Sequence, residues 1–259
     1  MILAARSIAS PRPDHSVGMW DDNHKYHWTG GEAMPSVTGI LRLQDALMGG
    51  DGLTNWAAGI AADYVLTKTT LARPWREDNE TLRREAVAAV SAASRRGSAV
   101  HGQIADILSG GTYGYGDVRG TIIPTAEAAP YVYGFSMFLA EHRPQFIHSE
   151  QVVLSPSHGF GGRFDFIAKI GGRIALCDIK TGKLKASHRL QLAGYAAADF
   201  IGKPDDPTEY PLPRIKDFYV LLLREGSYEL VPLAVSREDR RHFLDLARTY
   251  AKAKAWERT

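Results

Sequence analysis

The chain has 259 residues, of which 44% are hydrophobic, and a formal net charge of only +2 at pH 7. This length and hydrophobic content suit a folded domain with a sizeable core, and the single cysteine excludes an intramolecular disulfide framework. The small net charge excludes the strongly basic class of nucleic-acid-binding domain, so any contact with DNA must rely on positive charge gathered locally.

The N-terminal residues predict a short leader before a globular domain. Residues 1–16 are expected to be flexible, and residues 17–259 to form one domain. No apolar run reaches the roughly 20 residues that span a bilayer, so we expect no membrane contact and an intracellular, cytoplasmic protein. A cleaved organelle presequence stays open as a less favoured alternative.

Sequence patterns in the first half of the domain are mostly helical. A short strand over residues 24–28 and a turn at Gly30-Gly31 precede a helix that Ser36 is expected to cap. Ser36 and Thr38 at this helix start could hold a backbone phosphate, although capping alone is the simpler interpretation. Apolar residues at helical spacing then predict three further helices, over residues 54–67, 79–108 and 127–141.

Strands dominate the second half. They are predicted at residues 146–154, 162–170 and 173–179, before a helix that contains residues 191–195. The remaining segments are a loop over 203–213, a hairpin of 216–223 with 228–233, and a closing helix over 237–256. This order predicts an α/β fold: a mixed-sheet core over about residues 95–235, flanked by helices, with an N-terminal helical addition over about residues 35–145.

The hairpin around Gly171-Gly172, a two-residue turn signal, carries the candidate chemistry. A turn there places Asp165 and Asp178 at similar heights on neighbouring strands. Asp178 and Lys180 share one strand face, while Ile179 faces the other way and leaves its backbone carbonyl near the same site. These oxygens suit a hard cation such as Mg²⁺ or Mn²⁺. Taken alone, an Asp-x-Lys triplet is more often an ion-paired surface hairpin.

The motifs around the triplet favour the metal interpretation. The segments G-G-R-F-D (161–165), D-I-K-T-G-K (178–183) and Q-L-A-G-Y (191–195) resemble the PD-(D/E)XK nuclease superfamily, in particular its RecB-like exonuclease branch. Upstream, R-G-S-A-V-H from Arg96 to His101 resembles that branch's R-G-[ST]-x-x-H pattern, and P-S-V-T (35–38) is similar to a segment near the start of stand-alone members. The resemblance covers roughly residues 35–198 and implies a restriction-endonuclease-like fold.

The resemblance also implies roles for single residues. His101, Asp165 and Asp178 would be metal ligands. The Ile179 carbonyl would complete the ligand set, and Lys180 would be the catalytic lysine, so that Asp165, Asp178 and Lys180 form the catalytic group. The alternative for His101 is a helix histidine satisfied by a local hydrogen bond.

Other positions are implied to support the site or contact DNA. Gln191 and Tyr195 stand at i and i+4 on one helical face and would face the DNA, with ordinary amphipathic packing an equal alternative. Glu150 matches a position where many relatives are acidic and is a weaker supporting candidate. Arg96 and Lys183 would contact phosphate, unless they are simply solvated surface charges.

The expected function is that of a Mg²⁺- or Mn²⁺-dependent deoxyribonuclease, by resemblance an exonuclease on DNA ends or single strands in replication, recombination or repair. A structure-specific endonuclease of the same superfamily and a non-catalytic nucleic-acid-binding module remain as alternatives. An iron–sulfur cluster, which some relatives carry, is excluded because it needs about four cysteine ligands. Because no ATP-binding loop is found, any unwinding would come from a separate helicase or recombination protein, in a phage-like or bacterial setting.

Overall fold

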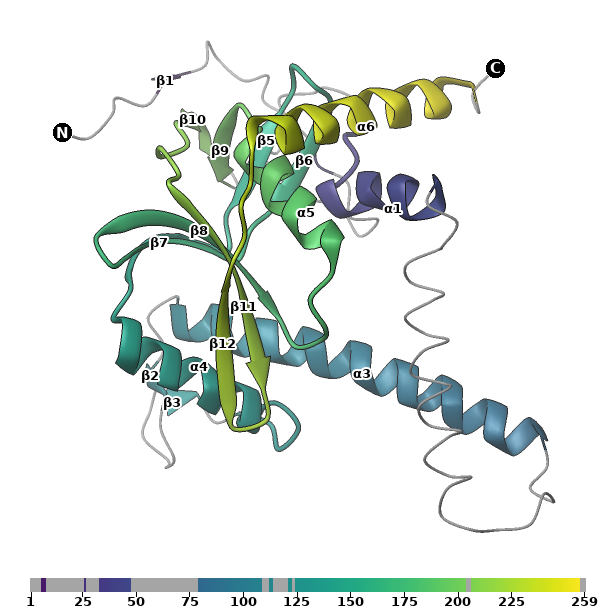
Figure 1. Cartoon of the computed structure of the whole chain (residues 1–259), viewed down its shortest axis with the longest axis vertical. Coiled ribbons are helices and arrows are strands. Elements are labelled where there is room, and N and C mark those ends of the chain that lie inside the picture. Colours follow the sequence, from purple (N-terminus) through teal and green to yellow (C-terminus); the bar gives the residue numbers. More distant parts are fainter. Residues whose placement is uncertain are drawn as a thin grey trace.

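A computed structural model gives the structure of the chain (Figure 1). It describes residues 6–7, 26, 33–47, 79–108, 112–113, 121–122, 124–203 and 206–256. The strand expected over residues 24–28, apart from Tyr26, and the helix expected over residues 54–67 lie outside these ranges. Most of residues 1–16 do as well, so the division into leader and domain stays a prediction.

The fold is α/β with a mixed sheet, as the sequence predicts. Within the described ranges this sheet has five strands in the order β12-β11-β8-β7-β4. They are β4 (Gln145–Ser149), β7 (Phe166–Ile170), β8 (Arg173–Lys180), β11 (Asp217–Arg224) and β12 (Ser227–Pro232). Strands β8 and β11 are parallel, and the chain between them passes through helix α5 (Ala186–Ala196) and two strands of a second sheet; the other neighbours are antiparallel.

A second sheet of five antiparallel strands has the order β1-β10-β9-β5-β6. Its strands are β1 (Arg6–Ser7), β5 (Val152–Ser155), β6 (Phe160–Arg163), β9 (Phe200–Lys203) and β10 (Asp206–Tyr210). Strand β10 corrects the loop expected over residues 203–213: the Asp206 carboxylate accepts hydrogen bonds from the Thr208 N–H and the Tyr210 hydroxyl, and β10 pairs with β9. A separate parallel pair joins β2 (Thr112–Tyr113) to β3 (Thr121–Ile122).

Two strands that were expected to be continuous are each divided between the two sheets. The predicted strand 146–154 is β4 and β5 with a break at Glu150, and the predicted strand 162–170 becomes part of β6 and β7 with a break at Phe164-Asp165. Glu150 has a left-handed backbone with φ of 51°. The Glu150 N–H still donates to the Asp165 carbonyl at 2.8 Å, so the two chain segments stay paired through the break. Because apolar residues flank each break, the sequence pattern alone predicts one continuous strand.

Helices cover both faces of the mixed sheet (Figure 1). One buried cluster joins the sheet to α3 (Asn79–Leu108) and α4 (Ala129–His142), and the other joins it to α1 (Val37–Leu47), α5 and α6 (Arg237–Trp256). Side chains of β8 alternate between the two: Cys177 and Ile179 lie in the first cluster and Leu176 in the second. The helices predicted over 79–108 and 237–256 are confirmed with these bounds. No helix in the described ranges is long and apolar enough to cross a membrane.

Candidate metal centre

Three carboxylates lie in one row across three neighbouring segments of backbone. The register of β7 and β8 pairs Phe166 with Cys177, so Asp165 lies opposite Asp178, as the Gly-Gly turn predicts. On its other side Asp165 lies opposite Glu150, whose backbone N–H it accepts. Residues directly opposite each other in antiparallel strands project to the same face, and like charges in such positions destabilise a sheet. The row therefore needs cations close to it.

Each carboxylate in the row has its own cationic partner. The distances from nitrogen to carboxylate oxygen are 3.1 Å for His101 and Asp165, 2.6 Å for Lys180 and Asp178, and 3.3 Å for Arg163 and Glu150. The predictions that Asp178 and Lys180 share one strand face and that His101 reaches the same site both agree with this geometry. Asp165 and Asp178 are nearly buried, with 8% and 2% of their surface exposed.

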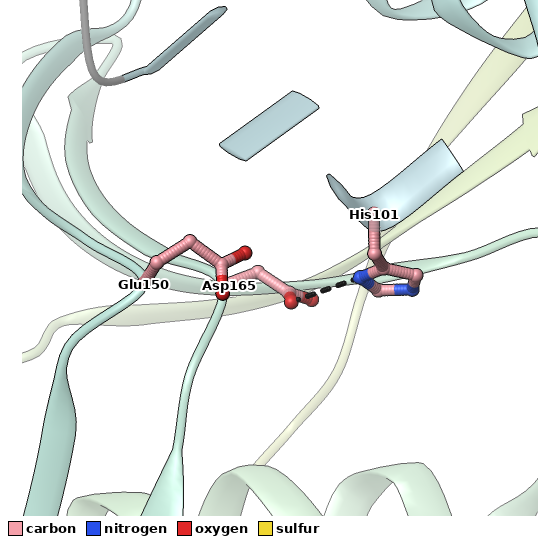
Figure 2. Close-up of side chains that lie close together, drawn as sticks. All are labelled: His101, Glu150 and Asp165. Carbon is pink, nitrogen blue, oxygen red and sulfur yellow. Dashed lines mark hydrogen bonds and ion pairs between the residues drawn. The ribbon is translucent and has the colours of Figure 1, made fainter. Parts of the chain in front are cut away.

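His101, Glu150 and Asp165 form a cluster that could hold a metal ion. One ligand atom from each residue lies within 4.8 Å of the others. Figure 2 shows Asp165 between Glu150 and His101, which reaches toward it from helix α3. Ligands on opposite sides of a divalent cation are about 4–5 Å apart, so small side-chain movements suffice for binding. Glu150, predicted only as a supporting residue, lies in this cluster, whereas Asp178, a predicted ligand, does not and is instead the next carboxylate in the row.

Burial and neighbouring charges shift the pKa values of the three acids in different directions. Burial, and then the charge of Asp165, raise the pKa of Glu150 to about 7. Burial also raises the pKa of Asp178, although Lys180 opposes the shift. Burial alone would raise the pKa of Asp165, but His101 and Lys180 lower it overall. Asp165 is therefore ionised at neutral pH, whereas Glu150 exchanges its proton near neutral pH.

Neighbouring carboxylates raise the pKa of both nitrogen groups of the predicted site. Burial would lower the pKa of Lys180, but Asp178 and Asp165 raise it overall. Burial would also lower the pKa of His101, and the charge of Asp165 and its hydrogen bond raise it overall. Lys180 therefore carries a positive charge beside the row. This charge suits it to orient an anion or a water molecule rather than to remove a proton.

Ile179 contributes to the site through its backbone. Its N–H donates to Oδ2 of Asp165 at 2.5 Å, while the Ile179 side chain is buried in the cluster beneath α3 and α4. Oδ1 of the same carboxylate meets His101, so both oxygens of Asp165 are held in place. The role predicted for the Ile179 carbonyl stays a prediction.

Helix α5 places two predicted residues beside the row. Nε2 of Gln191 donates to the Tyr195 hydroxyl at 2.8 Å, which fits their spacing of one helical turn. Tyr195 is almost fully buried, and its ring packs against Gly162 of β6. A Cβ atom on Gly162 would lie 2.7 Å from Cε1 of Tyr195 and 2.9 Å from Cγ2 of Val37. Gly162 therefore lets α1 and α5 approach the sheet closely, while Gly161 makes room for Tyr26.

A pocket of about 450 Å³ gives access to Asp165 and Asp178 of the row, whereas Glu150 does not line it. His101 and Lys180 also line it, together with the start of α1 and residues of α5 and α6; the other polar members include Ser36, Thr38, Arg42, Arg163, Gln191 and Tyr195. The predicted cap is confirmed, since Oγ of Ser36 accepts the Gly39 N–H at 2.9 Å. Pairing of Ser36 with Gly161 attaches the start of α1 to the edge of β6, beside the pocket.

Two predicted phosphate contacts do not lie in this pocket. The Arg96 guanidinium stacks 5.7 Å above the Tyr131 ring, on the α4 side, and Lys183 is exposed in the loop after β8. Conversely, sequence reasoning missed Arg163, which pairs with Glu150 and lines the pocket. A signal was present, because Arg163 lies two residues before Asp165 in the same extended segment.

Comparisons with known proteins leave the family open. A scan against protein-family models finds no match, and neither does a search of curated proteins. Among solved structures, one match is described as "Crystal structure of SSO0001"; it is 15% identical with a TM-score of 0.29 over 48% of this chain and 59% of that chain. So distant a likeness carries no functional argument.

Proposed function

We propose that this protein is a metal-dependent DNA nuclease. The observation that carries the proposal is the row of Glu150, Asp165 and Asp178, in which each acid is paired with a basic side chain and two of the acids, Asp165 and Asp178, line a pocket. Structural ion pairs rarely gather two buried carboxylates beside a third, half-buried one, because a carboxylate loses hydration on burial. A site that binds a divalent cation and a phosphate would explain why the protein tolerates this loss of hydration.

The ligand set supports a hard divalent cation, Mg²⁺ or Mn²⁺. His101, Glu150, Asp165 and Asp178 would hold the ion, with carboxylate oxygens in the majority. When bound, such an ion lowers the pKa of a water molecule and stabilises negative charge on a phosphate. Lys180, whose Nζ lies 2.6 Å from Asp178, would orient the attacking water and balance the charge of the phosphate.

Exonuclease action on DNA ends or single strands is the favoured form, by resemblance to the RecB-like branch. The second form, an endonuclease, shares the same metal centre.

The test compares wild type with Asp178→Ala. End-labelled single-stranded DNA, linear duplex and closed circular plasmid are each incubated with Mg²⁺, Mn²⁺ or EDTA. We expect metal-dependent loss of linear DNA, reduced at least 100-fold in Asp178→Ala because a ligand and the partner of Lys180 are both lost.

Asp217→Ala is the matched control. Asp217 is also a strand aspartate paired with a basic residue, Arg173, but it does not line the pocket. Its loss should leave cleavage unchanged. Cutting of the circular plasmid would favour the endonuclease form, and equal activity of Asp178→Ala and wild type would refute the site.

A further inference from the structure

We propose that Arg163 is a positioning residue of the metal centre, which holds the Glu150 carboxylate where it can bind the ion. The inference rests on the metal centre of the proposed function. It assigns a role to a residue that the predicted nuclease motifs leave without one, since in G-G-R-F-D the chemistry lies in the aspartate.

The first support is the place of Arg163 in the fold. It is the last residue of β6, two residues before Asp165, and its pairing partner in β5 is Val152, two residues after Glu150. Arg163 and Glu150 are therefore diagonal neighbours on two paired segments, at the point where both segments pass from one sheet to the other. From this position the guanidinium Nε reaches Oε2 of Glu150 at 3.3 Å.

The second support is what Glu150 would do without this contact. Its neighbour across the ladder is the ionised Asp165, whose charge repels it. Its backbone has the left-handed φ of 51°, and a glutamate has three side-chain torsions with which to turn away. An ion pair through Oε2 opposes that movement and leaves Oε1 for the ion. Carboxylates that bind metals are commonly held by such outer contacts.

The third support comes from comparing Arg163 with the other cations of the row. His101 can itself bind a metal, and Lys180 pairs with Asp178. A guanidinium cannot bind a metal, so Arg163 can favour ion binding only indirectly, by positioning the Glu150 carboxylate. The Arg163 side chain lines the pocket and is 42% exposed, whereas the Glu150 side chain is 18% exposed. The arginine therefore contacts Glu150 from the solvent side.

Mn²⁺ affinity of the full chain, measured by calorimetry without DNA, tests the proposal. We expect Arg163→Gln to weaken Mn²⁺ binding about tenfold and Arg163→Lys to recover part of the loss. This direction is informative, because removing a positive charge near a cation site would by simple electrostatics strengthen Mn²⁺ binding. Arg173→Gln, which breaks an exposed ion pair with Asp217 outside the pocket, should leave the affinity unchanged.

A double-mutant cycle shows whether Arg163 acts through Glu150. In the Glu150→Gln background, Arg163→Gln should cause no further loss of Mn²⁺ affinity. The same tenfold loss in both backgrounds would overturn the proposal, as would unchanged or tighter binding in Arg163→Gln. If Mn²⁺ affinity is unchanged and KM for DNA rises at saturating Mn²⁺, Arg163 is a substrate contact instead, and the proposal fails.

The outcome is separable from that of the proposed function. A protein that shows the expected Mn²⁺ pattern but cleaves no DNA would refute the nuclease and leave Arg163 in its role. A protein that cleaves DNA, with Mn²⁺ affinity indifferent to Arg163, would refute the role alone. Thermal unfolding of each variant without metal verifies that the fold is retained.

Discussion

Charge balance governs the residues of the metal centre. Glu150, Asp165 and Asp178 are drawn into one row by strand register, and each is neutralised by a different partner. The partners differ in kind: an imidazole that can bind a metal, an ammonium that can orient a phosphate, and a guanidinium that can hold a carboxylate. Loss of any one carboxylate should therefore change a different property of the site.

Glu150 offers a pH-dependent measurement in the absence of metal. Because its pKa is raised from 4.5 to about 7, the folded state keeps a proton that the unfolded state releases at lower pH. This contribution favours the fold in acid and is lost as the pH rises through about 7. Glu150→Gln should therefore be more stable than wild type at pH 8, by about 2 kcal/mol, and the difference should disappear below about pH 5. Urea unfolding in EDTA at both pH values measures it.

The same comparison has a clear contrary outcome. If the stability difference between Glu150→Gln and wild type does not vary between pH 5 and 8, the proton of Glu150 is not linked to folding. The row would then be better solvated than its buried position indicates.

The site lies where two paired chain segments, β4–β5 and β6–β7, pass from one sheet to the other. Strands β4 and β7 belong to the mixed sheet and β5 and β6 to the antiparallel sheet, and the break between them carries Glu150 and Asp165. Helix α5 and the start of α1 lie close to β6 because Gly162 has no side chain where Tyr195 and Val37 pack. Close approach of helices to the strand, not the strand alone, shapes the pocket.

Gly162→Ala tests this close approach. The added methyl group would lie 2.7 Å from Tyr195 and 2.9 Å from Val37, both in the packed core, so we expect a loss of about 2 kcal/mol in the free energy of unfolding. Nuclease activity should fall as well, because Tyr195 must shift away from Gln191. Gly182→Ala is the matched control, since its Cβ would meet no atom within 4 Å. Equal stability of the two variants would show that the contact between β6 and α5 relaxes without cost.

The whole molecule brings its candidate metal ligands from helix α3 and from the boundary between the two sheets. His101 comes from a 30-residue helix, and Glu150 and Asp165 come from the breaks between the two sheets. A bound ion would therefore link α3 to both sheets and stabilise the folded state as a whole.

Mn²⁺ should accordingly raise the melting temperature. At a concentration about 100 times its Kd, an ion that binds only the folded state adds about 2.7 kcal/mol, which corresponds to a rise of about 5–10 °C for a chain of this size. The rise should vanish in EDTA and in Asp165→Asn. Scanning calorimetry with and without Mn²⁺ measures it, and an unchanged melting temperature with Mn²⁺ would count against the metal centre.

The sequence by itself determined those features that depend on local patterns. The Gly171-Gly172 turn, with positive φ at both residues, places Asp165 opposite Asp178, and helical periodicity predicts the bounds of α3 and α6. The Asp178 and Lys180 pair follows from the two-residue repeat of a strand. These features need only neighbours along the chain.

Tertiary structure alone decided the remaining parts of the centre. Glu150 becomes a third acid of the row, and Arg163 its partner, because the ladder bends between two sheets. Arg96, five residues before His101, lies over Tyr131 because its helix face packs on α4. A one-dimensional pattern shows which residues alternate or repeat, but the packing of separate elements decides which faces meet and therefore which charges share a site.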